Sequence, residues 1–84
     1  MKDSLHYIVA AIVDHPDMVV IDETQDGDTS VFTIHVHADD MGQVIGKSGR
    51  IIKAIRDLAK VIAAKHNRYI DVVLFEEEPA APQA

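Results

Sequence analysis

Apolar residues recur along the chain with two different periods, one typical of helices and the other typical of strands. Residues 3–15 carry the i, i+3, i+4, i+7, i+8 spacing of an amphipathic helix, at Leu5, Ile8, Val9, Ile12 and Val13. Asp3 or Ser4 is placed to cap the start of this helix, and Pro16 follows its end. The first element is therefore predicted to be a helix.

Three short stretches rich in apolar and β-branched residues predict strands. Residues 18–21 are expected to form the first strand, and residues 22–30 its end and a hairpin turn around Asp26-Gly27-Asp28. In the second strand, residues 31–37, alternation places one set of side chains on one face: Phe32, Ile34 and Val36. The third strand, residues 69–75, does the same with Ile70, Val72 and Leu74.

Two helices are predicted between the second and third strands. Asp39 or Asp40 caps a short helix that continues to about Ile45. A long helix covers residues 50–66, and Asn67 ends it. Its apolar stripe consists of Ile51, Ile52, Ile55, Leu58, Ala59 and Ile62. The element order α-β-β-α-α-β predicts an α+β fold, with a three-stranded sheet covered on one face by helices.

Length and composition indicate one small globular domain. The 84 residues are 48% hydrophobic, which is enough for one core, and we place the domain at residues 1–75. Residues 76–84 are acidic and then rich in proline and alanine, so a disordered tail is predicted there. The chain has no cysteine, no signal-peptide pattern and no apolar run of membrane-spanning length. The lack of cysteine suits a reducing compartment without proving one, and we expect no membrane partner.

Charge is unevenly distributed along the chain, although the formal net charge is −6. Residues 47–68 carry seven Lys or Arg residues against one acid, Asp57, which gives +6; the remainder carries Lys2 against thirteen acids, which gives −12. A basic surface on an acidic body attracts a polyanion locally and discourages indiscriminate binding. The alternative is that these Lys and Arg residues simply solvate an exposed helix face. This explains Lys60 and Lys65 well, but it explains Lys47 and Arg50, which flank the glycine loop, less well.

That loop is Gly46-Lys47-Ser48-Gly49, which lies between apolar residues and is followed by Arg50. Glycines have no Cβ, so they let the backbone approach a ligand closely. Free N–H groups at the start of the following helix, together with the local positive charge, suit a phosphate. The pattern predicts binding to a phosphate backbone.

The stretch Gly42-Gln43-Val44-Ile45-Gly46-Lys47-Ser48 also looks like a P-loop, a second phosphate-binding motif. It has three residues between the glycines where a P-loop has four, and a P-loop follows a buried strand, whereas residues 38–41 look like a helix start. The chain is also short for a nucleotide-hydrolysing fold. We therefore favour the nucleic-acid interpretation and expect no enzyme and no cofactor.

The nine residues Val44-Ile45-Gly46-Lys47-Ser48-Gly49-Arg50-Ile51-Ile52 resemble the signature of the KH domain, whose GXXG loop clamps about four nucleotides of a single strand. The predicted element order is that of the type II KH fold, so the resemblance covers about residues 3–75. A single KH domain of this length resembles the KhpA (YlqC) family of small bacterial RNA-binding proteins. That resemblance implies a cytoplasmic protein that acts on bacterial transcripts, often paired with a second KH protein of the KhpB (Jag) type.

The candidate RNA-binding residues follow from this resemblance and from their chemistry: Ile45, Gly46, Lys47, Ser48, Gly49, Arg50 and Lys53. Lys47 offers a mobile point charge and Arg50 a forked donor for phosphate. Ile45 and Ile52 are candidates for the apolar floor of a groove or for core, and we favour core for Ile52. Ile70 and Val72 are candidates for the wall of that groove.

Other chemistry-bearing residues receive a weaker interpretation. His35 and His37 lie on one strand face, where an acid such as Asp71 would complete a metal site, but such pairs usually line a half-exposed sheet, so we expect no metal. Tyr69 is expected to pack rather than to stack on a base. With only four aromatic residues, the chain does not suit readers that stack bases on aromatic platforms.

Two functions remain in view from the residues alone. The favoured one is a module that binds single-stranded RNA, and the alternative is an interaction module that uses the same fold as a dimerisation surface. The basic loop favours the first, and the residues alone do not separate RNA from DNA. The expected partners are single-stranded RNA and a second KH domain, in a homodimer or in a heterodimer with a KhpB/Jag-like protein.

Overall fold

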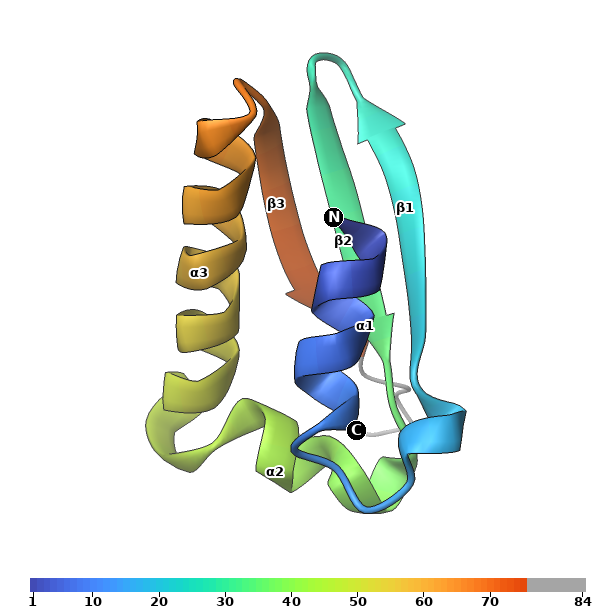
Figure 1. Cartoon of the computed structure of the whole chain (residues 1–84). Helices are drawn as coiled ribbons and strands as arrows, with labels where there is room; N and C mark the ends of the chain where they lie inside the picture. The colour runs from blue at the N-terminus through green and yellow to red at the C-terminus, as the bar shows by residue number, and fades with distance from the viewer. Residues whose placement is uncertain (76–84) are drawn as a thin grey trace, which may run out of the picture.

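The computed structural model describes residues 1–75, and its elements follow the predicted order (Figure 1). They are α1 (Lys2–Ala10), β1 (Val20–Asp26), β2 (Thr29–His35), α2 (Met41–Ile45), α3 (Arg50–Lys65) and β3 (Tyr69–Leu74). Short 3-10 turns precede β1, α2 and α3, at Pro16–Met18, Ala38–Asp40 and Lys47–Gly49. The tail predicted for residues 76–84 lies outside the described residues.

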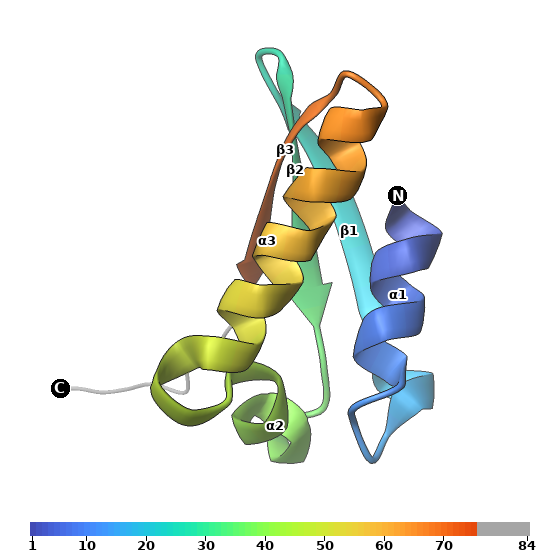
Figure 2. The ribbon, with the colours of Figure 1, turned by 60° about the vertical axis from the view of Figure 1, so that its left-hand side comes forward.

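The three strands form one sheet in the order β1-β2-β3. β1 pairs antiparallel with β2 through a tight hairpin, whereas β3 pairs parallel with β2 because α2 and α3 carry the chain back along the sheet. Both ribbon views place α1 and α3 on the same face of this sheet (Figures 1 and 2). The α+β fold with helices on one face is thus confirmed.

The hydrophobic core lies between the helices and the sheet face that they cover. Its buried residues come from every helix and strand: Leu5, Val9, Val19, Ile21, Phe32, Ile34, Val44, Ile55, Ala59, Ala63, Ile70 and Val72. Ile51 and Leu58 of the predicted stripe lie at the margin of α3 and are 40% and 48% exposed. None of the helices within residues 1–75 has both the length and the apolar character that crossing a bilayer requires.

β1 is longer than its polar sequence predicts. The expected strand over residues 18–21 is wrong in its bounds, because Met18 belongs to the preceding 3-10 turn and β1 continues to Asp26. Backbone pairing with β2 runs along the whole stretch, which tolerates polar side chains on an edge strand. Only Gly27 and Asp28 remain for the turn, and the φ of +64° at Gly27 suits such a two-residue connection.

α1 ends at Ala10, five residues earlier than the apolar pattern predicts. Ile12 and Val13 still pack against the core, but they do so from the turn that follows the helix. The N-cap is Met1, so the prediction that Asp3 or Ser4 caps this helix is wrong.

Asp40 stands at the start of α2, but its carboxylate does not cap that helix. The side chain is fully buried and faces the connection between α1 and β1. There Oδ1 accepts a hydrogen bond from the N–H of Asp14 (3.2 Å), and Oδ2 accepts one from the N–H of His15 (3.0 Å). The His15 Nδ1 lies 3.0 Å from the same Oδ2. The predicted cap is therefore replaced by a link between two loops that are distant in sequence.

These hydrogen bonds also determine the charge state of Asp40. Burial by itself raises the pKa of this carboxyl, but the hydrogen bonds from Asp14 and His15 outweigh burial and hold the pKa below its ordinary value of 3.8. The carboxylate is therefore ionised at neutral pH and able to accept all three hydrogen bonds.

At the middle of the outer edge of β3, the side chains of Arg56 and Asp71 form hydrogen bonds with the backbone of Val72. The C=O of Val72 accepts a hydrogen bond from Nε of Arg56 in α3 (3.1 Å), and the N–H of Val72 donates to Oδ1 of Asp71 (2.9 Å). One acceptor and one donor that a neighbouring strand would use are thus already satisfied.

We predict that Asp40→Asn lowers the melting temperature by several degrees at pH 7. The amide keeps one acceptor but turns an N–H donor toward the donors of Asp14 or His15. Thermal unfolding followed by circular dichroism measures the effect, and Asp39→Asn is the matched control because that side chain is 77% exposed.

We also predict how the difference in melting temperature between the native protein and Asp40→Asn depends on pH. Because the pKa of Asp40 is lowered by folding, its contribution to stability is present above the ordinary value of 3.8 and is lost as the pH falls through the folded value. The difference in melting temperature between the native protein and Asp40→Asn should shrink below about pH 4. A difference that is absent at pH 7, or that does not diminish in acid, would contradict this role.

Candidate nucleic-acid interface

Residues Gly46–Gly49 form the turn between α2 and α3, at the lower left of Figure 1. Three of these four residues have a positive φ: Gly46 at +76°, Ser48 at +57° and Gly49 at +73°. The N–H of Gly49 donates to the C=O of Gly46 at 3.2 Å and closes the turn. A non-glycine residue at the φ of Ser48 is uncommon, so the tip is held in a specific conformation.

The two glycines are required for different reasons. A Cβ at Gly46 would collide with Ile51, whose backbone N would lie only 2.9 Å away. A Cβ at Gly49 would meet no atom within 4 Å. Gly46 therefore allows the loop to pack against the start of α3, while the backbone at Gly49 is open to an approaching ligand.

The start of α3 lies next to this opening, and the N–H of Arg50 donates to the C=O of Lys47 within the turn. Its N-cap is Gly49, and no side chain caps the helix. The N–H groups of the first helical turn have no partner within the helix and lie at the positive end of its dipole. Together with the open backbone at Gly49, these groups form a surface that suits an anion.

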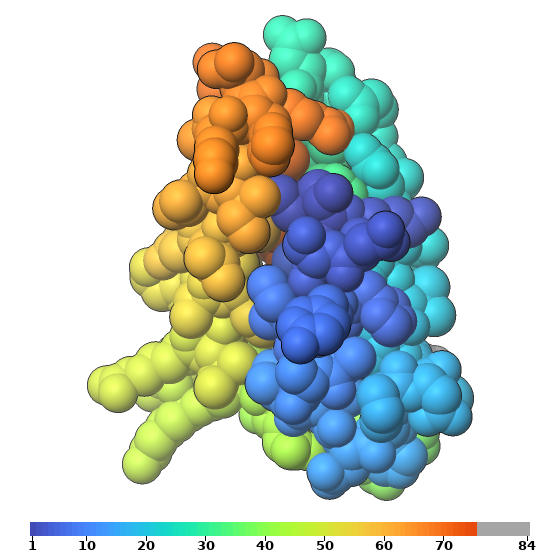
Figure 3. Space-filling model, viewed as in Figure 1, coloured from blue at the N-terminus to red at the C-terminus, as the bar shows by residue number. Residues whose placement is uncertain are grey.

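Positive side chains surround the loop. Lys47, Ser48 and Arg50 are exposed, and in the space-filling view long side chains of this yellow-green segment project from the lower left of the molecule (Figure 3). Lys53, one turn further along α3, holds its ammonium 2.8 Å from the carboxylate of Asp57, and this hydrogen bond lowers the pKa of Asp57. Lys47 and Arg50 therefore provide the charge nearest the loop.

The apolar candidates divide between the loop and the core. Ile45 is half-buried directly before Gly46, and Ile52 is half-buried and packs against the core, as expected for Ile52. Ile70 and Val72 are buried beneath the helices, at 7% and 0% exposure, so neither offers a wall to a groove beside the loop, although Ile70 contributes to the lining of a cavity at the other end of α3.

The P-loop alternative does not fit the geometry. Gly42 lies inside helix α2, and a 3-10 turn rather than a strand precedes that helix. Within the described residues, no hydrogen bond joins the hydroxyl of Ser48 to a general base. The described side chains therefore give no support to a nucleophilic role for Ser48.

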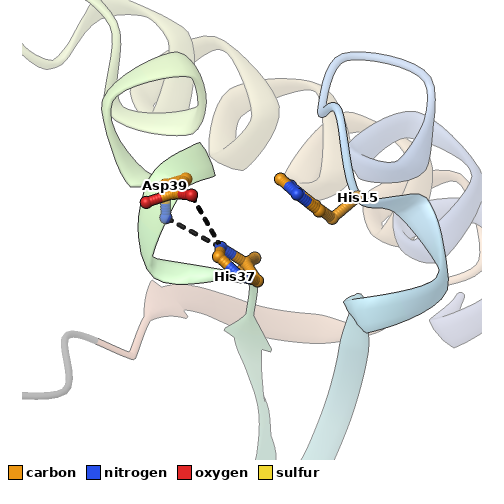
Figure 4. A group of neighbouring side chains, drawn as sticks. All are labelled: His15, His37 and Asp39. Atoms are coloured by element: carbon orange, nitrogen blue, oxygen red, sulfur yellow. Dashed lines mark hydrogen bonds and ion pairs between the residues drawn. The ribbon is translucent and has the colours of Figure 1, made fainter.

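A histidine cluster lies beside the buried Asp40. His15 stacks on His37 with ring centroids 4.1 Å apart and planes inclined by 14°, and Figure 4 shows His37 directed toward Asp39. His37 Nδ1 accepts the N–H of Asp39 at 3.0 Å, and His15 Nδ1 contacts Asp40. Ligand atoms of His15, His37 and Asp39 all lie within 4.8 Å of one another, which is close enough for a metal ion, while the Nδ1 atoms of both rings are already engaged by Asp40 and by the N–H of Asp39.

The predicted pairing of His35 with His37 does not occur in this structure. His35 Nε2 lies 2.8 Å from Oδ2 of Asp22, and its ring contacts Phe75 at a centroid distance of 4.7 Å. His37 lies beyond the end of β2 and faces a different loop.

Two features of this surface were missed by sequence reasoning. The packing role predicted for Tyr69 is wrong, since its side chain is 74% exposed. Strand alternation carried that signal, because Tyr69 is out of phase with Ile70 and Val72. No sequence pattern indicated the hydrogen bond from Arg56 to Val72, which depends on how α3 lies across the sheet edge.

Comparison with protein families matches residues 2–74 to the family KhpA/KhpB, KH domain. The chain is 44% identical over 70 residues to the RNA-binding protein KhpA of Halalkalibacterium halodurans, covering 83% of this chain and 92% of that protein. It is 40% identical over 78 residues to KhpA of Chlamydia pneumoniae, covering 93% and 100%, and 38% identical over 76 residues to KhpA of Listeria monocytogenes, covering 90% and 100%.

Among solved structures, the fold is similar to the crystal structure of an Era variant from Aquifex aeolicus bound to GDP and aluminium fluoride. The TM-score is 0.64 at 15% identity, and the match covers 88% of this chain and 29% of that one. At this identity the likeness concerns the fold alone. The family match covers almost all the described residues, and the KhpA relatives align over most of their own length. This chain therefore belongs to the KhpA/KhpB family of KH domains.

Proposed function

We propose that this protein binds single-stranded RNA and that the Gly46–Gly49 loop clamps the backbone of the bound strand. The observation that carries the proposal is the basic, uncapped glycine turn at the start of α3. Its geometry presents backbone donors and the exposed cations Lys47 and Arg50 to one region of solvent. Relatives named RNA-binding protein KhpA support RNA as the ligand.

In this proposal each loop residue has a separate role. Gly49 lets a phosphate approach the amides at the start of α3, because the position of its absent Cβ is open. Lys47 and Arg50 neutralise the phosphates on either side, and the small Ser48 leaves room at the tip. Ile45 offers half-buried apolar surface for a base, and Lys53 extends the positive charge along α3.

We further propose that the ligands are bacterial transcripts bound in the cytoplasm, where such transcripts are made and translated. The relatives support this setting, since they are bacterial proteins. Binding is supported by the backbone donors and cations of the loop and by the relatives, which are named RNA-binding proteins.

Pairing with a second KH domain forms part of the proposal. One clamp contacts about four nucleotides, too few to select a transcript, and joining two weak sites raises avidity by roughly 10² to 10⁴ without new contacts. The family name couples KhpA with KhpB, which supports a homodimer or a heterodimer with a KhpB/Jag-like protein.

We predict that the double variant Lys47→Asp, Ser48→Asp abolishes binding to short single-stranded RNA. Two carboxylates would replace a cation and a hydroxyl at the place of the phosphate. Folding should persist because both side chains are exposed and aspartate tolerates the left-handed backbone of position 48. Fluorescence anisotropy with a labelled oligonucleotide measures binding, and the melting temperature monitors the fold.

The matched control is Lys2→Asp, Ser4→Asp, which makes the same two replacements on exposed positions of α1. This variant should bind RNA like the native protein. Retained binding by a folded loop variant, or equal losses in the loop and control variants, would refute the clamp.

We predict that binding weakens with salt at a slope of log K against log salt of about −2. Neutralisation of about three phosphates of a single strand by the loop corresponds to this value. A titration from low to physiological salt measures the slope. A slope near zero, or a preference for duplex over single strand, would contradict the clamp.

We predict a self-associated state or a stable complex with a second KH-domain protein. Light scattering after size exclusion, at tens of micromolar, should give twice the 9.3 kDa of one chain, or 9.3 kDa together with capture of the partner. A mass of one chain without capture of a KhpB-type protein would leave the monomer as the working unit.

A further inference from the structure

A solvent-exposed cavity lies at the end of α3 opposite the glycine loop. We call it the distal cavity; its lining is Lys60, Ala64, Asn67, Arg68, Tyr69 and Ile70, and its volume is about 490 Å³. This size is within the range of sites that hold small molecules or single nucleotides. In Figure 1 it belongs to the top of the molecule, where the orange connection joins α3 to β3.

The walls of the distal cavity are held by backbone hydrogen bonds. Asn67 has a φ of +58° and follows His66, the C-cap residue of α3, as in a Schellman motif. Its N–H donates to the C=O of Ala64 (3.0 Å), and the N–H of Arg68 donates to the C=O of Ala63 (2.9 Å). The turn therefore presents the next residues in a fixed direction.

Arg68 adds a side-chain anchor to the same wall. Its guanidinium donates to Oγ of the buried Ser30 (2.9 Å) and lies 3.6 Å from the carboxylate of Glu23. Ser30 in turn donates to Oε1 of Gln25 at 2.8 Å. These contacts fix the Arg68 wall of the distal cavity to the β1–β2 hairpin.

Tyr69 gives the distal cavity an aromatic surface. Its side chain is 74% exposed, whereas Ile70 beside it is buried. The two stacked or tilted ring pairs found in residues 1–75 both involve histidines elsewhere, so the ring of Tyr69 is not occupied by another aromatic side chain. Any base presents a π-face that suits an exposed tyrosine, and single-strand binders use such rings in this way.

Positive residues connect the distal cavity with the glycine loop. Lys53, Arg56 and Lys60 are spaced by three and four residues, so they lie along one side of α3. The 16 residues of α3 span about 24 Å at about 1.5 Å each. The distal cavity therefore lies about the length of α3 away from the glycine loop.

We infer that the distal cavity is a second nucleotide subsite for the same RNA strand, which rests on the proposed function of the loop. One base stacks on Tyr69, the carboxamide of Asn67 hydrogen-bonds the edge of that base, and Lys60 contacts the adjoining phosphate. Asn67 offers both donors and acceptors, so it suits the edge of a base. The subsite extends the contacted strand beyond the four nucleotides of one clamp.

The test compares Tyr69→Ala with the native protein on a tetranucleotide and on an octanucleotide of single-stranded RNA. Loss of one stacked base should weaken octanucleotide binding about tenfold, while tetranucleotide binding stays unchanged. Tyr69→Phe keeps the ring and should bind like the native protein. Tyr69→Leu keeps apolar strand character without the ring and should behave like Tyr69→Ala, which guards against a folding artefact.

The matched control is Tyr7→Ala, because Tyr7 is 77% exposed and lies on α1, outside both sites. It should leave both affinities unchanged. Undiminished octanucleotide binding by Tyr69→Ala overturns the subsite, and so does an equal loss on both lengths, which would assign Tyr69 to the clamp itself. The loop variant separates the two ideas: if it still binds both RNAs, the clamp fails, whereas a length-specific loss in Tyr69→Ala would still support the distal cavity.

Discussion

The position of the glycine loop depends on the hydrogen bonds that the buried carboxylate of Asp40 accepts. α2 has only five residues, too few to be stable alone, and Val44 is its only buried residue. Asp40 holds the start of this helix to Asp14 and His15, and the side-chain amide of Gln43 adds a hydrogen bond to the C=O of Ile12 (3.2 Å). Since α2 ends at the loop, these contacts with the α1–β1 connection determine where the loop begins.

Sequence reasoning found the features that follow from periodicity. The strong repeat of α3, the alternation in β3 and the glycine loop lie where the pattern placed them, whereas β2 is Thr29–His35 instead of the predicted residues 31–37. The length of β1 was missed because its pairing comes from β2 and not from its own polar residues. The role of Asp40 was also missed, since a helix cap and a long-range link give the same local sequence.

Part of the candidate site was beyond prediction for a related reason. The spacing of Lys47 and Arg50 around the glycines is local, and both are exposed beside the loop as expected. The burial of Ile70 and Val72 depends instead on which sheet face the helices cover, which strand alternation leaves open. The bond from Arg56 to Val72 depends on the angle between α3 and β3, a tertiary quantity with no local signal.

The uneven distribution of charge attracts a polyanion to one side of the molecule and repels it from the acid-rich sides. α3 and its flanking turns carry almost all the cations, whereas acids occupy β1, the hairpin and the α1–β1 connection. A polyanion that approaches from most directions meets a repulsive field, and only the side with α3 attracts it. The negative net charge therefore limits the directions from which a polyanion can approach the protein and bind.

The closed edge of β3 has a consequence for how copies of this chain pack at high concentration. At Val72 the hydrogen-bonding groups are occupied by Arg56 and Asp71, and the free edge on the other side of the sheet belongs to the acid-rich strand β1. Extension of the sheet from one molecule to the next is thus opposed at both borders, by occupied donors and acceptors at one and by like charge at the other. This arrangement protects a small, half-open sheet against cross-β aggregation.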